Sequence, residues 1–577
     1  MYTKTKLIKW QGTEKYHMKG IRLICLLAIF ALLLPLAFAA DEGIKPKKTG
    51  YARATVNLSW NIDLQGQELS ELQIKTFEFG NYPSQQRLYE TTSIPAYTET
   101  NAFKNGVLVF DLDPKKDFQG FSMQTELKVQ FGFDFAKATD ASNYLKESAY
   151  IKITPEIKQK ASQIASNYKT DMEKAVAIAQ WVHNNVKYDR NYINVVKGSD
   201  AVMSERAGTC DEFSHLFIAM LRSIGIPAKF AASYVYSGTD WGAHAFVEAA
   251  IDGEWIPFDP TFNEGIILDA THLKFGEGFD QADIKEDISI RSYNADVSKV
   301  KLTRDFDVKF NEVRNFPELF TLQLILPESE VGQGSIEAIK ARVSNKGNRL
   351  AVPLSLLLPP EVKISGENLV NEDKLVLLEP YEEKEVEWKV IIPKLESGYE
   401  YKFPVLIESL GQDATGTIRA SDEGDVQKNE ELKITGISSA KTGSGIQIAV
   451  TVKNTGNIEA AGSISMESQN HQSQSQPVAL GAGLERQFIF SLVPLEGEET
   501  LRGEFGLETT GKKTIQPFEF SLMASIQPPI WAPSSSISAT QGTGEGNQFA
   551  NIPGDYAVML GGMILIIALF FLAKWIL

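Results

Sequence analysis

Apolar and polar residues alternate along much of the chain that follows its hydrophobic N-terminal run. In residues 52–62 every second residue is apolar, which is the period of a β-strand with one buried face. Further segments with strand character follow at residues 72–79, 107–112 and 125–135. This pattern predicts an N-terminal β-sandwich domain over residues 41–145.

The apolar spacing becomes helical near residue 154. Thr154-Pro155 is an N-cap followed by proline at the first helical position, and residues 170–173 have the form of a capping box. A third helical stripe ends at Gly225. These helices, with the strand-like segments that follow them, predict a mixed α+β domain over residues 146–300.

Strand periodicity returns after about residue 302 and contains an internal repeat. An alternating strand runs into Asn-x-Gly-Asn at Asn345 and again at Asn454, 109 residues later (454 − 345). This offset is typical of immunoglobulin-like β-sandwiches, so we expect two of them, over residues 301–425 and 426–527. We interpret them as spacers, with substrate or wall binding as the alternative.

Both ends of the chain carry signals for export and anchoring. A basic segment, an apolar run and an Ala-x-Ala site predict a signal peptide over residues 1–40, with Met18 as an alternative start and an uncleaved anchor as the rival interpretation. Residues 556–573 contain no charged side chain and predict a transmembrane helix. Residues 528–555 before it predict a flexible stalk. We therefore expect a single-pass protein of the cell membrane with its body outside.

Charge and cysteine content narrow the class of protein. A net charge of −16 argues against nucleic acid as a partner, because phosphate binding needs a basic surface. Of the two cysteines, Cys25 lies in the predicted signal peptide. Cys210, at the predicted start of the third helix, is then the sole cysteine of the mature chain. It is either an inert core residue or a nucleophile.

The register of a predicted hairpin brings a histidine and an aspartate together. Asp252-Gly253 is a strong signal for a two-residue β-turn between two strands. In such a hairpin Phe246 faces Asp259, and His244, two residues from Phe246, points to the same side. His244 and Asp259 become diagonal neighbours with Cβ atoms about 7 Å apart or less.

A thiol, an imidazole and a carboxylate are the parts of a nucleophilic triad. The helix N-terminus favours the thiolate of Cys210, whereas Asp211 and Glu212 oppose it, so His244 is expected to provide most of the activation. Backbone N–H groups at the helix tip are the expected oxyanion donors. The alternative is a structural cysteine, a surface histidine and an aspartate in a turn.

Four segments in this order resemble the transglutaminase-like superfamily: Gly208–Phe213, Leu221–Ala228, His244–Glu248 and Trp255–Thr261. The resemblance covers roughly residues 150–270 and implies a papain-like α+β fold. The expected architecture is thus such a core flanked by an N-terminal β-sandwich and two C-terminal immunoglobulin-like sandwiches, with a C-terminal transmembrane helix.

The resemblance also implies roles: Cys210 is the nucleophile, His244 the base and Asp259 the orienting acid. The chain is then expected to be a surface-anchored cysteine acyltransferase or peptidase that acts on protein or peptide amides through a thioester. The alternative is a non-catalytic adhesion or assembly protein that uses the same fold for binding. No metal or cofactor is expected, because the scattered histidines offer no zinc-ligand spacing.

Four other residues have weaker candidate roles. His215 is expected on the surface or in packing contacts, and His183 is expected to face solvent. Glu248 shares a strand face with His244 and is a candidate contact of the site. Trp241 is expected either to line the groove for the acyl donor or to pack in the core.

Overall fold

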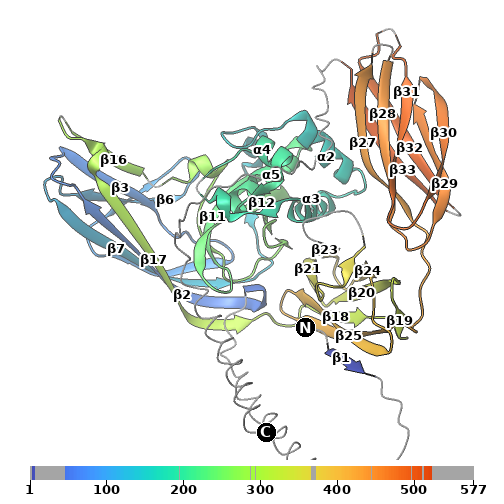
Figure 1. Ribbon diagram of the computed structural model, residues 1–577. Helices are drawn as coiled ribbons and strands as arrows, with labels where there is room; N and C mark the ends of the chain where they lie inside the picture. The colour runs from blue at the N-terminus through green and yellow to red at the C-terminus, as the bar shows by residue number, and fades with distance from the viewer. Residues whose placement is uncertain are drawn as a thin grey trace, which may run out of the picture.

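The computed structural model describes residues 3–6 and 46–522, apart from 194, 286, 293, 366–371, 443–444, 469, 496 and 510–511. Figure 1 shows several β domains around one group of helices. The predicted stalk, the predicted transmembrane segment and most of the predicted signal peptide lie outside the described residues. Among the helices that the structure does describe, none is long and apolar enough to cross a membrane.

The N-terminal domain has two four-stranded sheets that enclose one hydrophobic core. The first has the order β17-β2-β7-β4, with β2 (Thr49–Asp63), β4 (Gln85–Thr92), β7 (Phe118–Gln130) and β17 (Lys301–Asn315). The second has the order β16-β3-β6-β5, with β3 (Glu71–Phe77), β5 (Tyr97–Thr100), β6 (Gly106–Leu112) and β16 (Asp287–Arg291). Alternate residues of β2 are buried, as its apolar period predicts, and Trp60 stacks on Phe121 with ring centroids 4.9 Å apart.

This domain is discontinuous in sequence, which differs from the predicted boundaries. β16 and β17 follow the central domain in the chain but lie among the strands of the N-terminal one (Figure 1). β17 pairs with β2 along its length, from Lys301 opposite Asp63 to Asn315 opposite Thr49. The predicted boundary at residue 300 therefore assigns β17 to the wrong neighbour, because a strand's period shows that one face is buried but not which sheet it joins.

The central domain packs four α-helices on a six-stranded sheet, which includes the short edge strand β8 (Ala136–Lys137) beside the five strands given below. The helices are α2 (Pro155–Ala165), α3 (Asp171–Asn185), α4 (Ser199–Glu205) and α5 (Cys210–Ser223). The sheet has the order β14-β13-β12-β11-β15, with β11 (Ala228–Tyr236), β12 (Trp241–Ile251), β13 (Glu254–Asp259), β14 (Glu264–Gly265) and β15 (Leu273–Gly278). The predicted caps are present: the Thr154 side chain accepts from the Ile157 N–H, and Thr170 forms its capping box with Glu173.

Helix α5 lies between the other three helices and the sheet, where it contacts β11 and β12. It is therefore buried on all sides, and not only along its apolar stripe. Phe217 of α5 meets Phe258 of β13 edge to face, with ring centroids 5.6 Å apart. This packing fixes the first residue of the helix, Cys210, against the sheet.

Two further β-sandwiches follow. The first has the sheets β18-β20-β24-β22 and β19-β26-β25-β21-β23. Its strands are β18 (Phe320–Ile325), β19 (Val331–Gly332), β20 (Ile336–Asn345), β21 (Leu350–Leu357), β22 (Lys363–Ile364), β23 (Lys374–Leu378), β24 (Glu383–Ile391), β25 (Tyr399–Ser409) and β26 (Asp413–Ser421). Strand β1 (Thr3–Lys6), within the predicted signal peptide, pairs with β25. The core of this sandwich is continuous with that of the central domain.

The second sandwich has the sheets β27-β28-β31 and β30-β29-β32-β33 around its own core. Its strands are β27 (Leu432–Thr442), β28 (Gly445–Asn454), β29 (Ala460–Ser468), β30 (His471–Leu480), β31 (Glu485–Leu492), β32 (Thr500–Thr509) and β33 (Lys512–Ser521).

The internal repeat has the same structure in both sandwiches. Asn345 ends β20 and Asn454 ends β28. Each asparagine accepts a hydrogen bond from the glycine N–H two residues on, at 3.0 Å and 2.8 Å. Its amide donates to a carbonyl just beyond the turn and to one at the end of another strand. The Asn-x-Gly-Asn sequence thus makes a buried corner between two sheets.

Candidate active site

The hairpin that carries the candidate histidine and aspartate forms in the predicted register. Ile251 pairs with Glu254 and Val247 with Phe258. The turn between them, Asp252-Gly253, has positive φ at both residues (52° and 80°), which suits a two-residue hairpin. Continued by one step, this register sets Phe246 opposite Asp259.

His244 and Asp259 form a hydrogen bond, which confirms the predicted juxtaposition. Nε2 of His244 lies 2.7 Å from Oδ2 of Asp259, and both side chains are buried. Because a carboxylate can only accept, Nε2 carries the proton and Nδ1 remains the basic nitrogen. The ring of Phe262 stacks on His244 at 5.0 Å between centroids and holds the plane of the imidazole.

Cys210 is the first residue of α5, and a buried capping box sets its position. Oε2 of Glu212 accepts from the N–H and from the hydroxyl of Thr209, each at 2.8 Å. A Cβ added at Gly208 would lie 2.2 Å from Cβ of Glu212, so this position has room for glycine alone. The Gly-Thr-Cys-Asp-Glu segment is therefore a compact helix start that presents the thiol.

The thiol of Cys210 lies against the strand that carries His244. It is 7% exposed and accepts a hydrogen bond from the backbone N–H of Ala245, the residue after His244. Burial raises the pKa of Cys210 well above its ordinary value, and the charge of Asp211 adds to this effect. The hydrogen bond from Ala245 opposes them only in part. In this arrangement the neutral thiol is therefore the favoured form.

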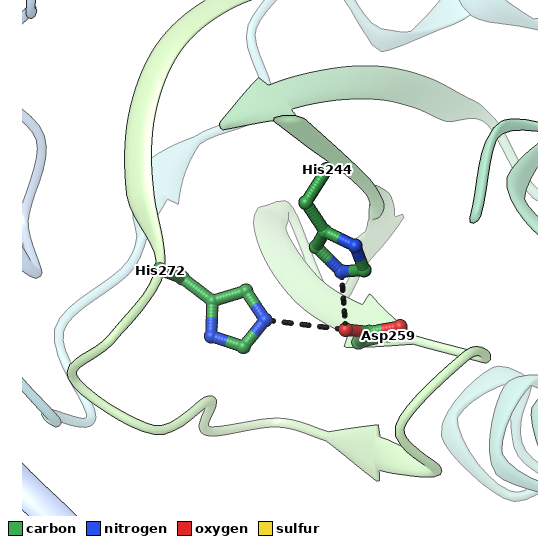
Figure 2. Close-up of side chains that lie close together, drawn as sticks. All are labelled: His244, Asp259 and His272. Atoms are coloured by element: carbon green, nitrogen blue, oxygen red, sulfur yellow. Dashed lines mark hydrogen bonds and ion pairs between the residues drawn. The ribbon is translucent and has the colours of Figure 1, made fainter. Parts of the chain in front are cut away.

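Asp259 is held by four groups at once. Its Oδ1 accepts from the backbone N–H groups of Thr261 (2.7 Å) and Phe262 (3.1 Å). Its Oδ2 faces Nε2 of His244 and, at 3.1 Å, Nε2 of a second histidine, His272 (Figure 2). Burial raises the pKa of Asp259, but the two histidines outweigh burial and lower the pKa, so the carboxylate is charged.

His272 is the functional candidate that the sequence analysis missed. It lies just before β15, and its Nδ1 is 3.3 Å from the carbonyl oxygen of Asp269 and 3.4 Å from Oδ1 of the same residue. No hairpin register links this segment to β13, because a loop separates them and β15 pairs with β11. No sequence signal therefore pointed to it.

Glu264 and Asp269 extend this buried cluster. Oε2 of Glu264 accepts from the Asp269 N–H at 3.0 Å. The other oxygens, Oε1 of Glu264 and Oδ2 of Asp269, are buried without a hydrogen-bond partner among the described residues. Burial and the charge of Asp269 raise the pKa of Glu264 to about 8.

Two sets of side chains are close enough together for a metal ion: His244, Asp259 and His272, and Glu264, Asp269 and His272. In the first set both Nε2 atoms already donate to one carboxylate oxygen. In the second, Nδ1 of His272 faces the carbonyl of Asp269. We describe both sets as hydrogen-bonded networks.

His183 is buried, contrary to the expectation that it faces solvent. Its Nδ1 lies 3.2 Å from the carbonyl oxygen of Pro260, and its Nε2 lies 3.0 Å from Oδ2 of Asp373 in the loop before β23. The side chain thus ties α3 to the residue after Asp259 and to the first C-terminal sandwich. Its burial follows from this contact between domains, which the period of an isolated helix does not show.

Glu248 lies on the same strand face as His244, but it forms ion pairs with two lysines outside the triad. It lies 2.9 Å from Nζ of Lys229 and 2.7 Å from Nζ of Lys274. Both lysines also pair with Glu277, at 2.7 Å each. Glu248 therefore belongs to an alternating ring of four charges.

The remaining two candidates are packing residues. Trp241 packs on Phe310 of β17, with ring centroids 4.9 Å apart. His215 is fully buried in α5 and stacks on Tyr150 at 5.3 Å.

Part of the chain is similar to known proteins. Residues 158–260 match the family model of the transglutaminase-like superfamily. The uncharacterized protein ML0607 of Mycobacterium leprae is 25% identical over 148 residues, which are 24% of this chain and 52% of that protein. The uncharacterized protein YebA of Bacillus subtilis is 22% identical over 147 residues, or 21% of this chain and 20% of that protein. The chain thus matches about half or less of the length of these relatives.

Solved structures are similar at a lower level. A proposed cysteine protease from Cytophaga hutchinsonii has a TM-score of 0.37 and 20% identity, over 47% of this chain and 94% of that one. The periplasmic domain of TgpA from Pseudomonas aeruginosa has a TM-score of 0.21 and 16% identity, over 36% of this chain and 90% of that one. The family match over residues 158–260 identifies the central domain of this chain as a member of the transglutaminase-like superfamily.

Proposed function

We propose that this protein is a cysteine acyltransferase or cysteine peptidase with Cys210 as nucleophile, His244 as base and Asp259 as orienting acid. Membership of the superfamily supports a cysteine-dependent enzyme in general terms. The observation that carries the assignment of residues is the buried 2.7 Å contact between His244 and Asp259, on the strand whose next residue binds the thiol of Cys210.

In the proposed reaction each residue of the triad has one role. Nδ1 of His244 takes the proton of Cys210 while the sulfur attacks an amide carbonyl carbon and the π electrons move to oxygen. The tetrahedral species collapses, the C–N bond breaks, and Nδ1 returns the proton to the leaving amine. An amine or a water molecule then attacks the thioester carbon and gives a proton to Nδ1 of His244, the C–S bond breaks, and Cys210 leaves as the thiolate, which takes the proton back from Nδ1. Asp259 accepts from Nε2 throughout and stabilises the imidazolium.

Because burial favours the neutral thiol of Cys210, formation of the thiolate in this mechanism depends on proton transfer to His244. Backbone N–H groups at the start of α5 are the proposed oxyanion donors.

The expected substrates are amides of proteins or peptides at the cell surface. This part of the proposal rests on the predicted signal peptide, the predicted transmembrane segment at residues 556–573 and the sandwiches between the central domain and that segment. It places the reaction outside the membrane and involves no nucleic acid.

One observation favours a second candidate function. The raised pKa and low exposure of Cys210 are what a structural thiol would show, so a non-catalytic adhesion or assembly protein is the alternative. Such a protein would use the same fold to bind its partners.

Alkylation separates the two functions. The detergent-solubilised full chain is treated with iodoacetamide, and modification of Cys210 is followed by mass spectrometry. Rapid alkylation of the folded protein that is lost in H244A supports catalysis, whereas a thiol that reacts only after denaturation contradicts it. H471Q is the matched control, because His471 pairs with Glu498 in the second C-terminal sandwich, remote from the site.

Incubation with a glutamine-containing peptide, with and without a primary amine, then identifies the acceptor. Incorporation of the amine indicates acyl transfer, and release of ammonia or of a peptide fragment without it indicates hydrolysis. C210S is expected to abolish either product.

A further inference from the structure

His272 contacts Asp259 directly, on the same carboxylate oxygen that His244 contacts. Figure 2 shows both imidazoles directed at the same carboxylate from different segments of the chain. The ring of His272 is 5.4 Å from that of His244 between centroids, and its side chain is 4% exposed. It therefore lies within the catalytic network without lying next to Cys210 in the proposed mechanism.

The neighbours of His272 determine its protonation. Nε2 faces Oδ2 of Asp259 at 3.1 Å, and Nδ1 faces the carbonyl oxygen and Oδ1 of Asp269 at 3.3 Å and 3.4 Å. All three oxygens are acceptors. A neutral imidazole has one N–H and would direct a lone pair at one of them, whereas an imidazolium donates to both sides.

We propose that His272 is a positioning residue of the active site, a protonated imidazole clamped between Asp259 and Asp269 that orients the Asp259 carboxylate and balances part of its charge. This proposal rests on the function proposed above. It assigns no step of bond making or breaking to His272, which acts on the reaction through Asp259 and His244.

The charges around His272 are consistent with a fixed cation. Asp259 is charged, Asp269 carries the second negative charge, and Glu264 beside Asp269 is held mostly neutral at pH 7 by burial. Lys274 lies in β15, two residues after His272, and its positive charge is balanced by ion pairs with Glu248 and Glu277. Burial lowers the pKa of His272, but the charge of Asp269 and the hydrogen bond that His272 donates to Asp259 outweigh it and raise the pKa well above the ordinary value.

A fixed cation at this position changes the chemistry of the triad. With His272 protonated, Asp259, His272 and Asp269 together carry a single negative charge when they face His244. Without that cation they would carry two and would disfavour the thiolate of Cys210. His272 thus keeps the thiolate–imidazolium pair accessible at a lower pH than a bare aspartate would.

Nitrogen-15 NMR of the histidine rings tests the protonation directly on the full chain. The chain has six histidines, and the signal of His272 is assigned by its loss in H272Q. We expect both ring nitrogens of His272 to remain protonated at pH 8, well above the ordinary histidine pKa of about 6.5. Titration of this ring near pH 6.5 would overturn the proposal.

The pH dependence of Cys210 alkylation tests the effect on the site. H272Q keeps an N–H donor for Asp259 but removes the charge, whereas H272F removes both. We expect the midpoint of the alkylation profile to rise by about one pH unit in H272Q. If His272 had a purely structural role, H272Q would have the wild-type midpoint. The remote control H471Q is expected to have the wild-type midpoint in either case.

The two proposals fail in different ways. If Cys210 of the folded wild-type protein does not react at any pH, the catalytic function is contradicted, while the NMR measurement still reports the charge of His272. Suppose instead that Cys210 reacts normally, but that the ring of His272 loses its proton near pH 6.5 or H272Q has the wild-type midpoint. The catalytic proposal then stands, and the proposed role of His272 is wrong.

Discussion

At the scale of single residues, the charge of the site depends on the protonation of its buried carboxyl groups, and Asp259 and Glu264 differ in this respect. Asp259 is charged because two imidazoles and two backbone N–H groups face it. Glu264 has one N–H donor and a neighbouring carboxylate, so burial dominates its pKa. The same side-chain chemistry therefore gives an orienting anion at one position and a neutral acid at the other.

The neutral state of Glu264 makes stability depend on pH. Its pKa is about 8 in the folded protein, whereas the unfolded value is about 4.3. The folded state binds the extra proton between these values, so stability falls as pH rises through this window, by at most about 1.4 kcal/mol per pH unit. We expect E264Q to flatten the fall in melting temperature between pH 5 and 8 and to melt higher than wild type at pH 8. Parallel melting curves for the two proteins would contradict this assignment.

Gly208 offers a second test at this scale. A methyl group in G208A would collide with Cβ of Glu212 and break the capping box that positions Cys210. We expect the alkylation rate of Cys210 to fall about tenfold or more. A tenfold fall corresponds to an increase of about 1.4 kcal/mol in the activation free energy. G242A is the matched control, since a Cβ there meets nothing within 4 Å; equal rates in the two variants would count against the role of Gly208.

At the scale of elements, the two asparagine corners explain why the repeat is readable in the sequence. Each asparagine replaces backbone hydrogen bonds that the chain loses when it turns from one sheet to the other. An alanine in its place would leave carbonyl groups buried without a donor.

We expect N454A to destabilise the second C-terminal sandwich by about 2–3 kcal/mol, because a buried carbonyl, a partly buried carbonyl and a backbone N–H lose their partner. Hydrogen exchange should increase over residues 432–521 while Cys210 reactivity is unchanged. N345A is the comparison: its increased exchange should fall in the first sandwich, whose core is shared with the central domain. Exchange that rises equally in both sandwiches in either variant would refute this local role.

Local periodicity predicted most of the elements and part of the site. The helices, their caps and the hairpin follow from spacing within about fifteen residues, and so the contact between His244 and Asp259 could be predicted. His272 could not, because its place is set by a loop and by a strand that joins the far side of the sheet. The burial of His183 depends on another domain.

At the scale of the whole molecule, the central domain is an insertion between β7 and β16 of the N-terminal one. Strand β17 then links the two bodies: its Phe306 stacks on Tyr234 of β11 at 4.1 Å between centroids, and Arg304 hydrogen-bonds the Tyr234 hydroxyl. The sheet that carries His244 is therefore supported from behind by a strand outside the central domain.

This arrangement predicts where the chain can be shortened. Removal of residues 431–577 leaves every strand of the N-terminal, central and first sandwich domains in place, so Cys210 alkylation should keep its wild-type rate. Removal of residues 301–577 deletes β17 and the core shared with the first sandwich, and should yield protein without cooperative thermal unfolding. A cooperatively folded 1–300 chain would contradict the supporting role of β17.

The pairing of β2 with β17 also sets an order for folding during synthesis. Asp63 pairs with Lys301, 238 residues later (301 − 63), so on the order of ten to fifty seconds of translation separate the two strands. Over that interval the central domain emerges complete, while β2 still lacks one neighbour. The N-terminal domain, which is synthesised first, is therefore completed after the central domain that follows it. During that time the apolar strand β2 has an unpaired edge that is accessible to other chains.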